Sequence, residues 1–588
     1  MKSRSTLLAA VLLAALVLIG LRLIPGWDGF EPSAVVHEST TNAIEPRDSP
    51  FADAQRGAPP SPEAVGRELA SWVADGHEGL PPLLLDRART PPPDEGSALA
   101  PALEAALGEL GYDDYRRIEY RREASLWRDG GAFRLQFFHP GSIHTDQVRI
   151  HAIEGDRVER VRFAPELYQY WGDEDLSATL DGVELDFAGL RINHPLNQPE
   201  RWDEVAVFLG ASYFRLLGRG QVYGISGRGV AVHTTRGGRE EFPGFREFWV
   251  IRPDAEVNPG GSGDAETLDT SPGLHLFALL DGTSVTGAYR FHLIPGSPTI
   301  MEVDAHLFVQ RPLEQLGLAP LTSMFLTGPA TAPGVDDFRP RIHDSDGLLT
   351  LSGEGEWVWR PLSNGPGDRV TSIPVSDPRG FGLLQRNRDF SSYLDLEARY
   401  HDRPSLWVEM LDGDWGSGHV ELFELETDSE FADNIVAFWE PEGGAGAGEE
   451  FRVRYRLHSF DGRFEAQHLP QVEETRIGSA RLPGVAPSDE ADARRFVVDF
   501  HRADGADPRS PPDLEGVEVV YRASTGQVSD VRAELLPDGV GWRATFVLTP
   551  KPGEPSELGL FLRRGGEPLT ETWAYRWIPD PRDLPSER

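Results

Sequence analysis

Short alternating segments separated by turn residues dominate this chain and restrict it to a β-sheet protein. From Trp127 to about residue 470, apolar and polar residues alternate in runs such as FRLQFFHPG, GVELDFAGLRI and EVAVFLGASYFRLL. A period of two residues is typical of a strand with one buried face, and the Gly, Pro and Asp between the runs are turn residues. The sequence therefore predicts an all-β fold built mainly from antiparallel strands.

The alternation returns after a gap and predicts a second, smaller β domain. Residues 495–580 hold six short strand patterns, from RRFVVDF to TWAYRWI, which is the size and spacing of an immunoglobulin-like sandwich. The chain has no Cys, so this sandwich would lack a disulfide. Residues 471–494 show little periodicity and are predicted to be a linker. Since 588 residues are too many for one core, we assign residues 61–470 to a separate, large β domain.

The N-terminus predicts a membrane-targeting segment. Lys2 and Arg4 precede an apolar run from Leu7 to Leu21, and the apolar stretch extends through residue 24 with Arg22 inside it. Residues 7–24 are just long enough to span a bilayer, and no small-residue cleavage site follows closely. We therefore favour an uncleaved signal anchor over a cleaved signal peptide for residues 1–27, with the rest of the chain across the membrane. Residues 28–60 are polar and are predicted to be a linker.

The charge balance excludes one class of partner. The formal net charge is −37, whereas a nucleic-acid phosphate backbone requires a basic face. Nearly every cation is Arg, since Lys2 and Lys551 are the only lysines. We therefore expect no nucleic-acid partner.

A tract from Arg341 to Trp439 combines carboxylates with aromatic residues and predicts a sugar cleft. Its acids occur in RIHDSDG, RNRDF and DNIVAFW, and its rings include Trp357, Trp359 and Tyr400. Stacking rings and paired carboxylates are the groups that glycoside chemistry uses. Trp357 and Trp359 lie two residues apart and share a face of a strand, so core packing is an equal alternative for them. His343 beside two Asp residues gives no established metal-ligand spacing, and we expect no metal and no cofactor.

Several ordered segments resemble one known family. They include WRDGGAFRLQFFHPG (127–141), DEVAVFLGASYFR (203–215), LLDGTSVTGAYRF (279–291), RIHDSDGL (341–348), GEWVWRPL (355–362) and RDFSSYLDLEARY (388–400). Through these segments the chain resembles the OpgG/OpgD (MdoG/MdoD) family of osmoregulated periplasmic glucan biosynthesis proteins. The resemblance implies a galactose-mutarotase-like β-sandwich, a C-terminal immunoglobulin-like domain and a periplasmic location. It also implies a β-glucan partner with a β-1,2-linked backbone, and some members are similar to inverting β-1,2-glucanases.

The resemblance also assigns roles to particular residues. The family's general acid matches Asp433 in EFADNIVAFW, and its general base matches Asp344 in the HDSD motif, with the proton relayed through water. Tyr400 is expected to position water or sugar. The remaining residues expected to bind substrate are Glu430, Trp357, Trp359, Arg403 and His343. From residue chemistry alone, Asp344 can instead cap a turn, and Arg403 can instead pair with one of the many acids.

Alternative functions stay open at this point. A transglycosylase would use the same acid pair, and a non-catalytic glucan-binding or assembly factor would use the same cleft without turnover. Asp344, Ser345 and Asp346 form a D-x-D motif that also occurs in nucleotide-sugar glycosyltransferases, but the chain lacks the alternating βα pattern of that fold. The expected partners are the β-glucan and, through residues 7–24, the inner membrane; a homodimer stays open as an assembly state.

Overall fold

The computed structural model describes residues 58–91, 103, 107–171, 174–234, 240–253, 273–330, 336–480, 493–502, 512–537 and 539–579. The predicted signal anchor (1–27) and nearly all of the predicted linker (28–60) lie outside these residues. Among the residues described, no helix has the length and apolar character needed to cross a membrane.

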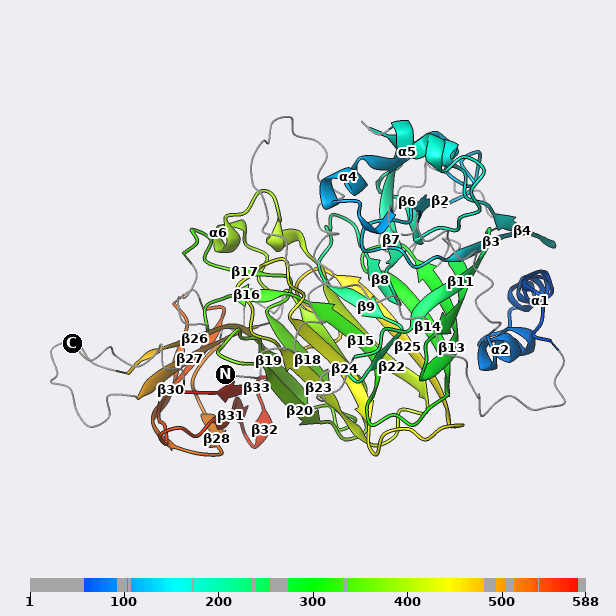
Figure 1. The fold of residues 1–588 in the computed structure, drawn as a ribbon. Coiled ribbons are helices and arrows are strands. Elements are labelled where there is room, and N and C mark those ends of the chain that lie inside the picture. Colours follow the sequence, from blue (N-terminus) through cyan, green and yellow to red (C-terminus); the bar gives the residue numbers. More distant parts are fainter. Residues whose placement is uncertain are drawn as a thin grey trace, which may run out of the picture. The chain divides into compact units, whose positions relative to one another are not determined.

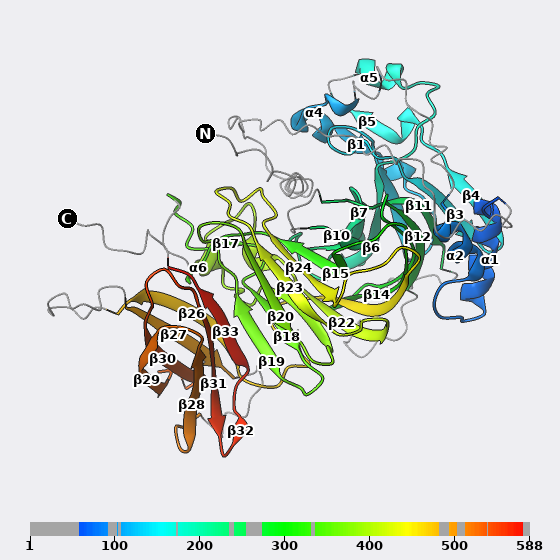
Figure 2. The same cartoon turned by 60° about the horizontal axis from the view of Figure 1, so that its bottom comes forward.

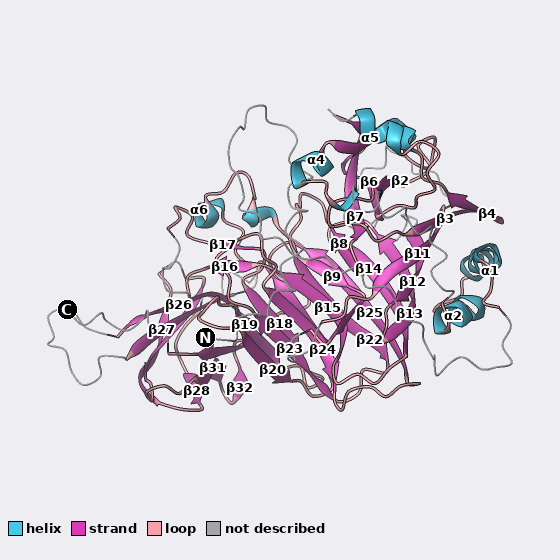
Figure 3. Ribbon diagram, viewed as in Figure 1, coloured by secondary structure: helices cyan, strands magenta, loops and turns pink. Residues whose placement is uncertain are grey.

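The prediction of an all-β fold is confirmed, because strands far outnumber helices in the described chain and the helices are short (Figure 3). The chain divides into two compact units. The first contains the described residues up to Pro320 together with Met410–Gly418 and Phe438–Ser459, and the second contains Leu321–Glu409, His419–Ala437 and the described residues from Phe460 onward. This division falls inside the predicted 61–470 domain.

The first unit contains two groups of hydrogen-bonded strands. One group has the order β4 (Arg157–Val161), β3 (Arg149–Glu154), β11 (Gly244–Ile251), β12 (Leu274–Asp281), β13 (Val285–Ile294), β14 (Thr299–Val309) and β25 (Glu450–Phe460). The other has the order β2 (Arg134–Phe138), β6 (Gly189–Gln198), β7 (Arg201–Leu209), β8 (Tyr213–Leu216) and β9 (Ser226–Arg228). Smaller pairings join β1 (Ile118–Tyr120) to β5 (Tyr168–Tyr170), and β10 (Val230–Val232) to β15 (Leu316–Ser323).

Aromatic side chains from both groups meet in the core of the first unit. The ring of Phe208 on β7 lies 5.0 Å from Phe291 on β13 and 5.3 Å from Phe248 on β11, both edge to face. Edge-to-face pairs at this distance are the favoured arrangement for aromatic rings. The two groups therefore pack as a sandwich, as the alternating pattern predicts for strands with one buried face.

Short helices complete the first unit. The helices are α1 (Pro62–Ala74), α2 (Pro82–Arg89), α4 (Tyr112–Arg116) and α5 (Glu174–Thr179). Ser61 caps the N-terminus of α1: its side chain accepts a hydrogen bond from the amide of Ala64. Pro62 occupies the first turn of the helix. Buried side chains of α1 and α2 pack against β3, β11, β12 and β14, so these helices cover one face of the larger group (Figure 1).

The second unit continues the β architecture, and its described residues include the short α-helix α6 (Phe390–Tyr393) and a 3-10 turn at Tyr400–Asp402. Its strands are β16 (Phe325–Thr327), β17 (Ile342–His343), β18 (Gly347–Leu351), β19 (Trp357–Pro361), β20 (Arg369–Pro374), β21 (Gly380–Leu384), β23 (Gly418–Glu424), β26 (Gln471–Ser479), β27 (Arg494–His501), β28 (Val517–Ala523), β29 (Gln527–Leu535), β30 (Gly541–Thr549), β31 (Ser556–Arg564), β32 (Glu567–Pro568) and β33 (Thr572–Trp577). Strands β15, β22 (Ser405–Gly413) and β24 (Ile435–Pro441) run through both units, and β23 and β25 each have one end residue, Gly418 and Phe460, in the other unit.

The six strands predicted between residues 495 and 580 all form, but the predicted linker is only partly a linker. Residues 471–479 form β26, which pairs antiparallel with β27 and completes the sheet β26–β27–β30–β29. Residues 481–492 of that linker lie outside the described residues. Strand β26 reads VEETRIGS after Gln471, and two features hide the alternation that identifies the other strands: a register shift between Val472 and Glu474, and the burial of the charged Glu474, which pairs with Arg341.

The C-terminal strands share a sheet with the strands that precede them in the second unit. β33 pairs in parallel with β19, matching Trp359 to Trp573, so the order β28–β31–β33–β19–β18–β21 is continuous (Figure 2). The C-terminal sandwich is therefore built into the second unit.

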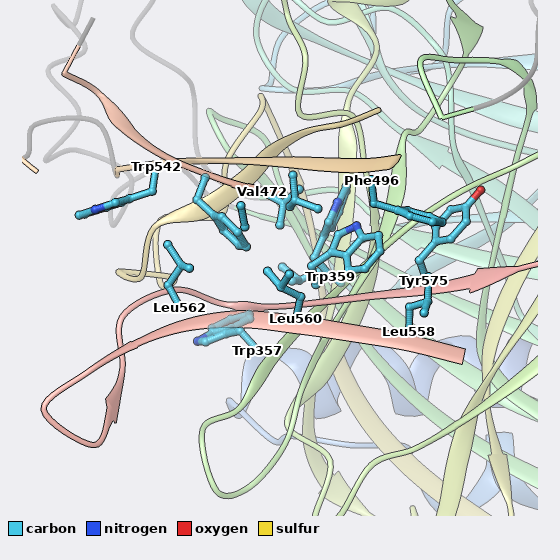
Figure 4. Packing of buried hydrophobic residues seen from close by; sticks show 14 of the residues in the cluster. Trp357, Trp359, Val472, Phe496, Trp542, Leu558, Leu560, Leu562 and Tyr575 are labelled. Atoms are coloured by element: carbon cyan, nitrogen blue, oxygen red, sulfur yellow. The ribbon is translucent and has the colours of Figure 1, made fainter. Parts of the chain in front are cut away.

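Trp357 and Trp359 lie in the core between these sheets. Their side chains are 8% and 3% exposed and belong to one buried apolar cluster with Phe496, Leu560 and Tyr575 (Figure 4). The two rings share a face, as their spacing requires, but that face is turned towards the C-terminal strands. The core-packing interpretation therefore replaces the sugar-stacking one for both tryptophans.

A buried ion pair joins the C-terminal strands to the end of β21. The guanidinium of Arg386 binds both carboxylate oxygens of Glu571, at 2.6 and 3.1 Å, and its Cζ lies 3.7 Å from the ring centroid of Trp359. Glu571 also accepts the amide of Val472 at 2.6 Å. Both charged side chains are almost fully buried. Geometry of this quality is what a buried pair requires to offset desolvation.

We expect Glu571→Gln to lower the free energy of unfolding by about 3–5 kcal/mol, because it leaves the Arg386 charge buried without an anion. Urea-induced unfolding followed by tryptophan fluorescence measures this loss.

Glu518→Gln serves as the matched control. Glu518 binds Arg563 at 2.6 Å but is 64% exposed, so its loss should cost less than about 1 kcal/mol. Equal losses in the two variants would contradict the assignment of Arg386 and Glu571 as the stabilising pair.

Candidate active site

A short antiparallel pair of strands in the second unit positions Asp344. Phe325 of β16 lies opposite His343 of β17, and the amide of Asp344 donates to the carbonyl of Met324 at 2.8 Å. The HDSDG sequence is compatible with an exposed turn, but residues 342–345 are buried and Asp344 is 3% exposed. Burial of a carboxylate requires compensating partners, so Asp344 is more than a turn cap.

Asp433 is positioned through the residue that follows it. The side-chain amide of Asn434 pairs with the backbone of Phe325: Oδ1 accepts the amide at 2.8 Å and Nδ2 donates to the carbonyl at 3.0 Å. Asp433 itself is half-buried. Asp344 and Asp433, 89 positions apart in the numbering of the chain, are thus each tied to one of two consecutive residues, Met324 and Phe325.

A chain of contacts leads from Asp344 to Glu430. Arg403 Nη1 donates to Asp344 Oδ1, and the Arg403 guanidinium lies 4.3 Å from the ring centroid of Tyr400. The Tyr400 hydroxyl donates to Glu430 Oε2 at 2.6 Å. Burial is the largest single influence on Arg403 and opposes its charge, but Asp344, Tyr400 and Asp395 together outweigh burial and raise the pKa of Arg403. The sequence left two roles open for Arg403, substrate binding or pairing with an acid. In the structure Arg403 pairs with the acid Asp344.

Tyr400 remains a neutral hydroxyl in this arrangement. Burial raises its pKa well above the usual value, and the nearby carboxylate of Glu430 adds to that shift. A neutral phenol donates one hydrogen bond, here to Glu430, and its oxygen can still accept one.

Arg339 holds three carboxylates and was not identified from the sequence. Its guanidinium binds Asp337 at 2.8 Å, Asp395 at 2.7 Å and Glu430 at 2.9 Å. The hydrogen bonds with Asp337 are the largest cause of its raised pKa, so it stays charged. Asp395 and Glu430 lie 56 and 91 residues away in sequence, so no local spacing could reveal the cluster.

His343 is held as a neutral ring inside the site. Gln385 Nε2 donates to the carbonyls of His343 and Tyr400, which turns its Oε1 towards His343 Nδ1 at 2.8 Å. Nδ1 therefore carries the proton. The ring stacks on Phe325 at 5.2 Å, and Tyr393 of α6 meets it edge to face at 5.3 Å. Burial lowers the pKa of His343 to about 3.

The structure thus brings together six of the residues selected from the sequence and separates two. Asp344, His343, Arg403, Tyr400 and Glu430 form the contacts described above, and Asp433 joins them through Asn434. Trp357 and Trp359 lie elsewhere, in the core. The site gains Arg339, Gln385 and Asp395, whose roles depend on partners distant in sequence.

Comparison with known proteins identifies the family. The family model described as "Periplasmic glucan biosynthesis protein, MdoG" matches residues 84–577. The chain belongs to this family. Among similar proteins, "Glucans biosynthesis protein G" of Vibrio cholerae is 40% identical over 82% of this chain and 83% of its own length. The protein of the same name from Ralstonia nicotianae is 41% identical over 80% of this chain and 91% of its own. The HDSD and DNI segments lie inside the matched range, so their resemblance is part of a match over most of the chain. Membership of this family implies a periplasmic location.

His343 should make the stability of the protein sensitive to acid. Between pH 6.5 and about 3 the unfolded chain binds a proton on this ring and the folded protein does not, so stability falls as the pH falls. We expect His343→Asn to remove this contribution, about 1.4 kcal/mol per pH unit. Urea unfolding of both proteins at pH 7 and pH 5 measures the change in their difference. A difference that is the same at both pH values would show that His343 is not buried as a neutral ring.

Proposed function

We propose that this protein processes periplasmic glucan as an inverting β-1,2-glucanase, with Asp433 as general acid and Asp344 as general base. The observation that carries the proposal is that the backbone of Asp344 and the side chain of Asn434, the residue after Asp433, bind two consecutive residues, Met324 and Phe325, which ties the two acid-bearing segments to one strand. The names of the relatives, glucans biosynthesis proteins, support glucan as the substrate.

In the proposed reaction, Asp433 donates its proton to the glycosidic oxygen as the bond from that oxygen to C1 breaks. A water attacks C1 from the opposite face, and its proton passes to Asp344, so the product has the inverted configuration. Carboxyl groups in inverting enzymes usually lie ~6.5–9.5 Å apart, and a relay through water and sugar hydroxyls would allow a longer gap.

The partners of the other acid explain why Asp433 is preferred as the proton donor. Glu430, three residues earlier, accepts hydrogen bonds from Tyr400 and Arg339 through both of its carboxylate oxygens. A carboxylate whose oxygens already accept from a phenol and a guanidinium is poorly placed to donate a proton to a substrate. Asp344 pairs with Arg403, which stabilises the charged carboxylate that a general base needs.

Two alternatives use the same residues differently. In a transglycosylase, a sugar hydroxyl replaces water as the attacking group, which suits a family named for biosynthesis. In an assembly factor, the site binds glucan and no bond is broken. Both retain glucan as the ligand, so the products of the reaction distinguish them.

We expect the purified protein to shorten linear β-1,2-glucan with inversion at the anomeric carbon, and Asp433→Asn and Asp344→Asn each to lower the rate by about 10²–10⁴-fold. Chromatography measures product length, and optical rotation measures the anomeric form. Asp513→Asn is the control, because Asp513 is an exposed acid that pairs with Arg564 in the C-terminal strands.

Each other outcome selects a different account. Longer, branched or cyclic products would favour the transglycosylase. Binding without turnover in the unsubstituted protein would contradict the hydrolase on this substrate and favour the assembly factor. Full activity in Asp433→Asn would contradict the assignment of the acid.

A further inference from the structure

Three large apolar side chains of the second unit face solvent at the edge of the candidate site. Phe338 is 76% exposed, Leu396 is 78% exposed and Phe431 is 56% exposed. A single exposed apolar residue is ordinary, but a cluster of them marks a binding surface. Each of them is next in sequence to a member of the Arg339 cluster, which consists of Arg339 and the three carboxylates that it binds, Asp337, Asp395 and Glu430. The three apolar residues therefore belong to one surface. We call them the apolar platform.

Each platform residue lies in a turn that is closed by hydrogen bonds. Across Phe338, Asp337 Oδ1 accepts the amide of Arg339 at 2.8 Å. Around Leu396, Asp395 Oδ1 accepts the amides of residues 397 and 398 at 2.8 and 2.7 Å. The amide of Phe431 donates to the Ser429 hydroxyl at 3.2 Å.

One guanidinium then joins the three turns. Arg339 binds Asp337, Asp395 and Glu430, which neighbour Phe338, Leu396 and Phe431 respectively. Ordering three loops costs conformational entropy, and these ion pairs offset it. The cluster therefore fixes apolar side chains that make little core contact, which is the arrangement of a preorganised binding surface.

We propose that the apolar platform binds a glucose ring of the glucan chain next to the position where the bond is cleaved. The inference rests on the proposed function and extends it to a particular subsite. Phe431 lies two residues from Asp433 and one from Glu430, whose carboxylate accepts from Tyr400, so the platform is continuous with the candidate site. Aromatic and aliphatic side chains contact the C–H face of a sugar, and the carboxylates beside them can accept from its hydroxyls.

The local charge favours a neutral polyhydroxyl ligand over an anionic one. One cation, Arg339, faces three anions, Asp337, Asp395 and Glu430, so the cluster carries a net charge of 1 − 3 = −2. Binding to an anionic membrane surface uses groups of Lys and Arg. The platform lacks such a group among its own residues, whereas an uncharged sugar meets no repulsion there.

The test measures glucan binding in the Asp433→Asn background, so that no turnover disturbs it. Isothermal titration with linear β-1,2-glucan should give a dissociation constant about tenfold or more higher when Phe338→Ala and Phe431→Ala are added together, because the apolar contact area is lost. Phe431→Tyr keeps the ring and should keep the affinity. Tyr521→Ala, which removes a 48% exposed ring from β28, should change it less than about twofold.

The outcomes separate the platform from the function on which it rests. Unchanged affinity in the double alanine variant, with binding retained, would overturn the platform alone. Unchanged affinity with a smaller sedimentation coefficient would overturn it too and would assign the surface to contact between copies of the chain. Absence of glucan binding before any platform substitution would overturn the proposed function and the platform with it. Because the substituted rings are exposed, the thermal midpoint should stay close to that of the parent, which verifies folding.

Discussion

The pairing of Arg386 with Glu571 supports much of the second unit, including the candidate active site. It fixes the C-terminal strands to the end of β21 and places a guanidinium on the face of Trp359. The residue before it, Gln385, orients His343 and binds the carbonyl of Tyr400. The ion pair between Arg386 and Glu571 therefore has two effects: it packs the C-terminal strands, and it fixes the backbone at Gln385 that orients the site residues. Residues far from the two acids, on the C-terminal strands, contribute to the site in this way.

The near absence of lysine has a structural consequence. A guanidinium has five N–H groups in a planar fork, whereas an ammonium group acts as a point charge. Arg339 uses this fork to bind three carboxylates, and Arg386 uses it for a bidentate pair while its face contacts a ring. Arg403 donates a hydrogen bond to Asp344 while the face of its guanidinium lies over the ring of Tyr400. A lysine at any of these positions would keep the charge and lose the geometry.

The parts of the structure that local sequence determines were predictable, and the parts that depend on distant contacts were not. Alternation identified the strands because a period of two is a local property. The spacing of Trp357 and Trp359 correctly gave a shared face, but it carries no information on whether that face meets solvent or another sheet. The strand at 471–479 was missed because a register shift and the buried, charged Glu474 obscure the alternation, and the Arg341 that pairs with Glu474 is distant in sequence. Asp344 and Asp433 were found through a family resemblance, whereas Arg339 follows no motif and became visible only through its partners.

Several strands have residues in both units, and the late segments that complete the first unit affect how the chain can fold. The first unit stays incomplete until residues 438–459 are available, because β14 obtains β25 as its second neighbour only from that segment. Until then, an eleven-residue strand presents an open edge, which is a hazard for aggregation. Contacts of such long sequence separation also slow folding. The first unit therefore cannot complete its sheet until the chain has been synthesised through residue 459. Folding after that point avoids a partly formed sheet with an exposed edge.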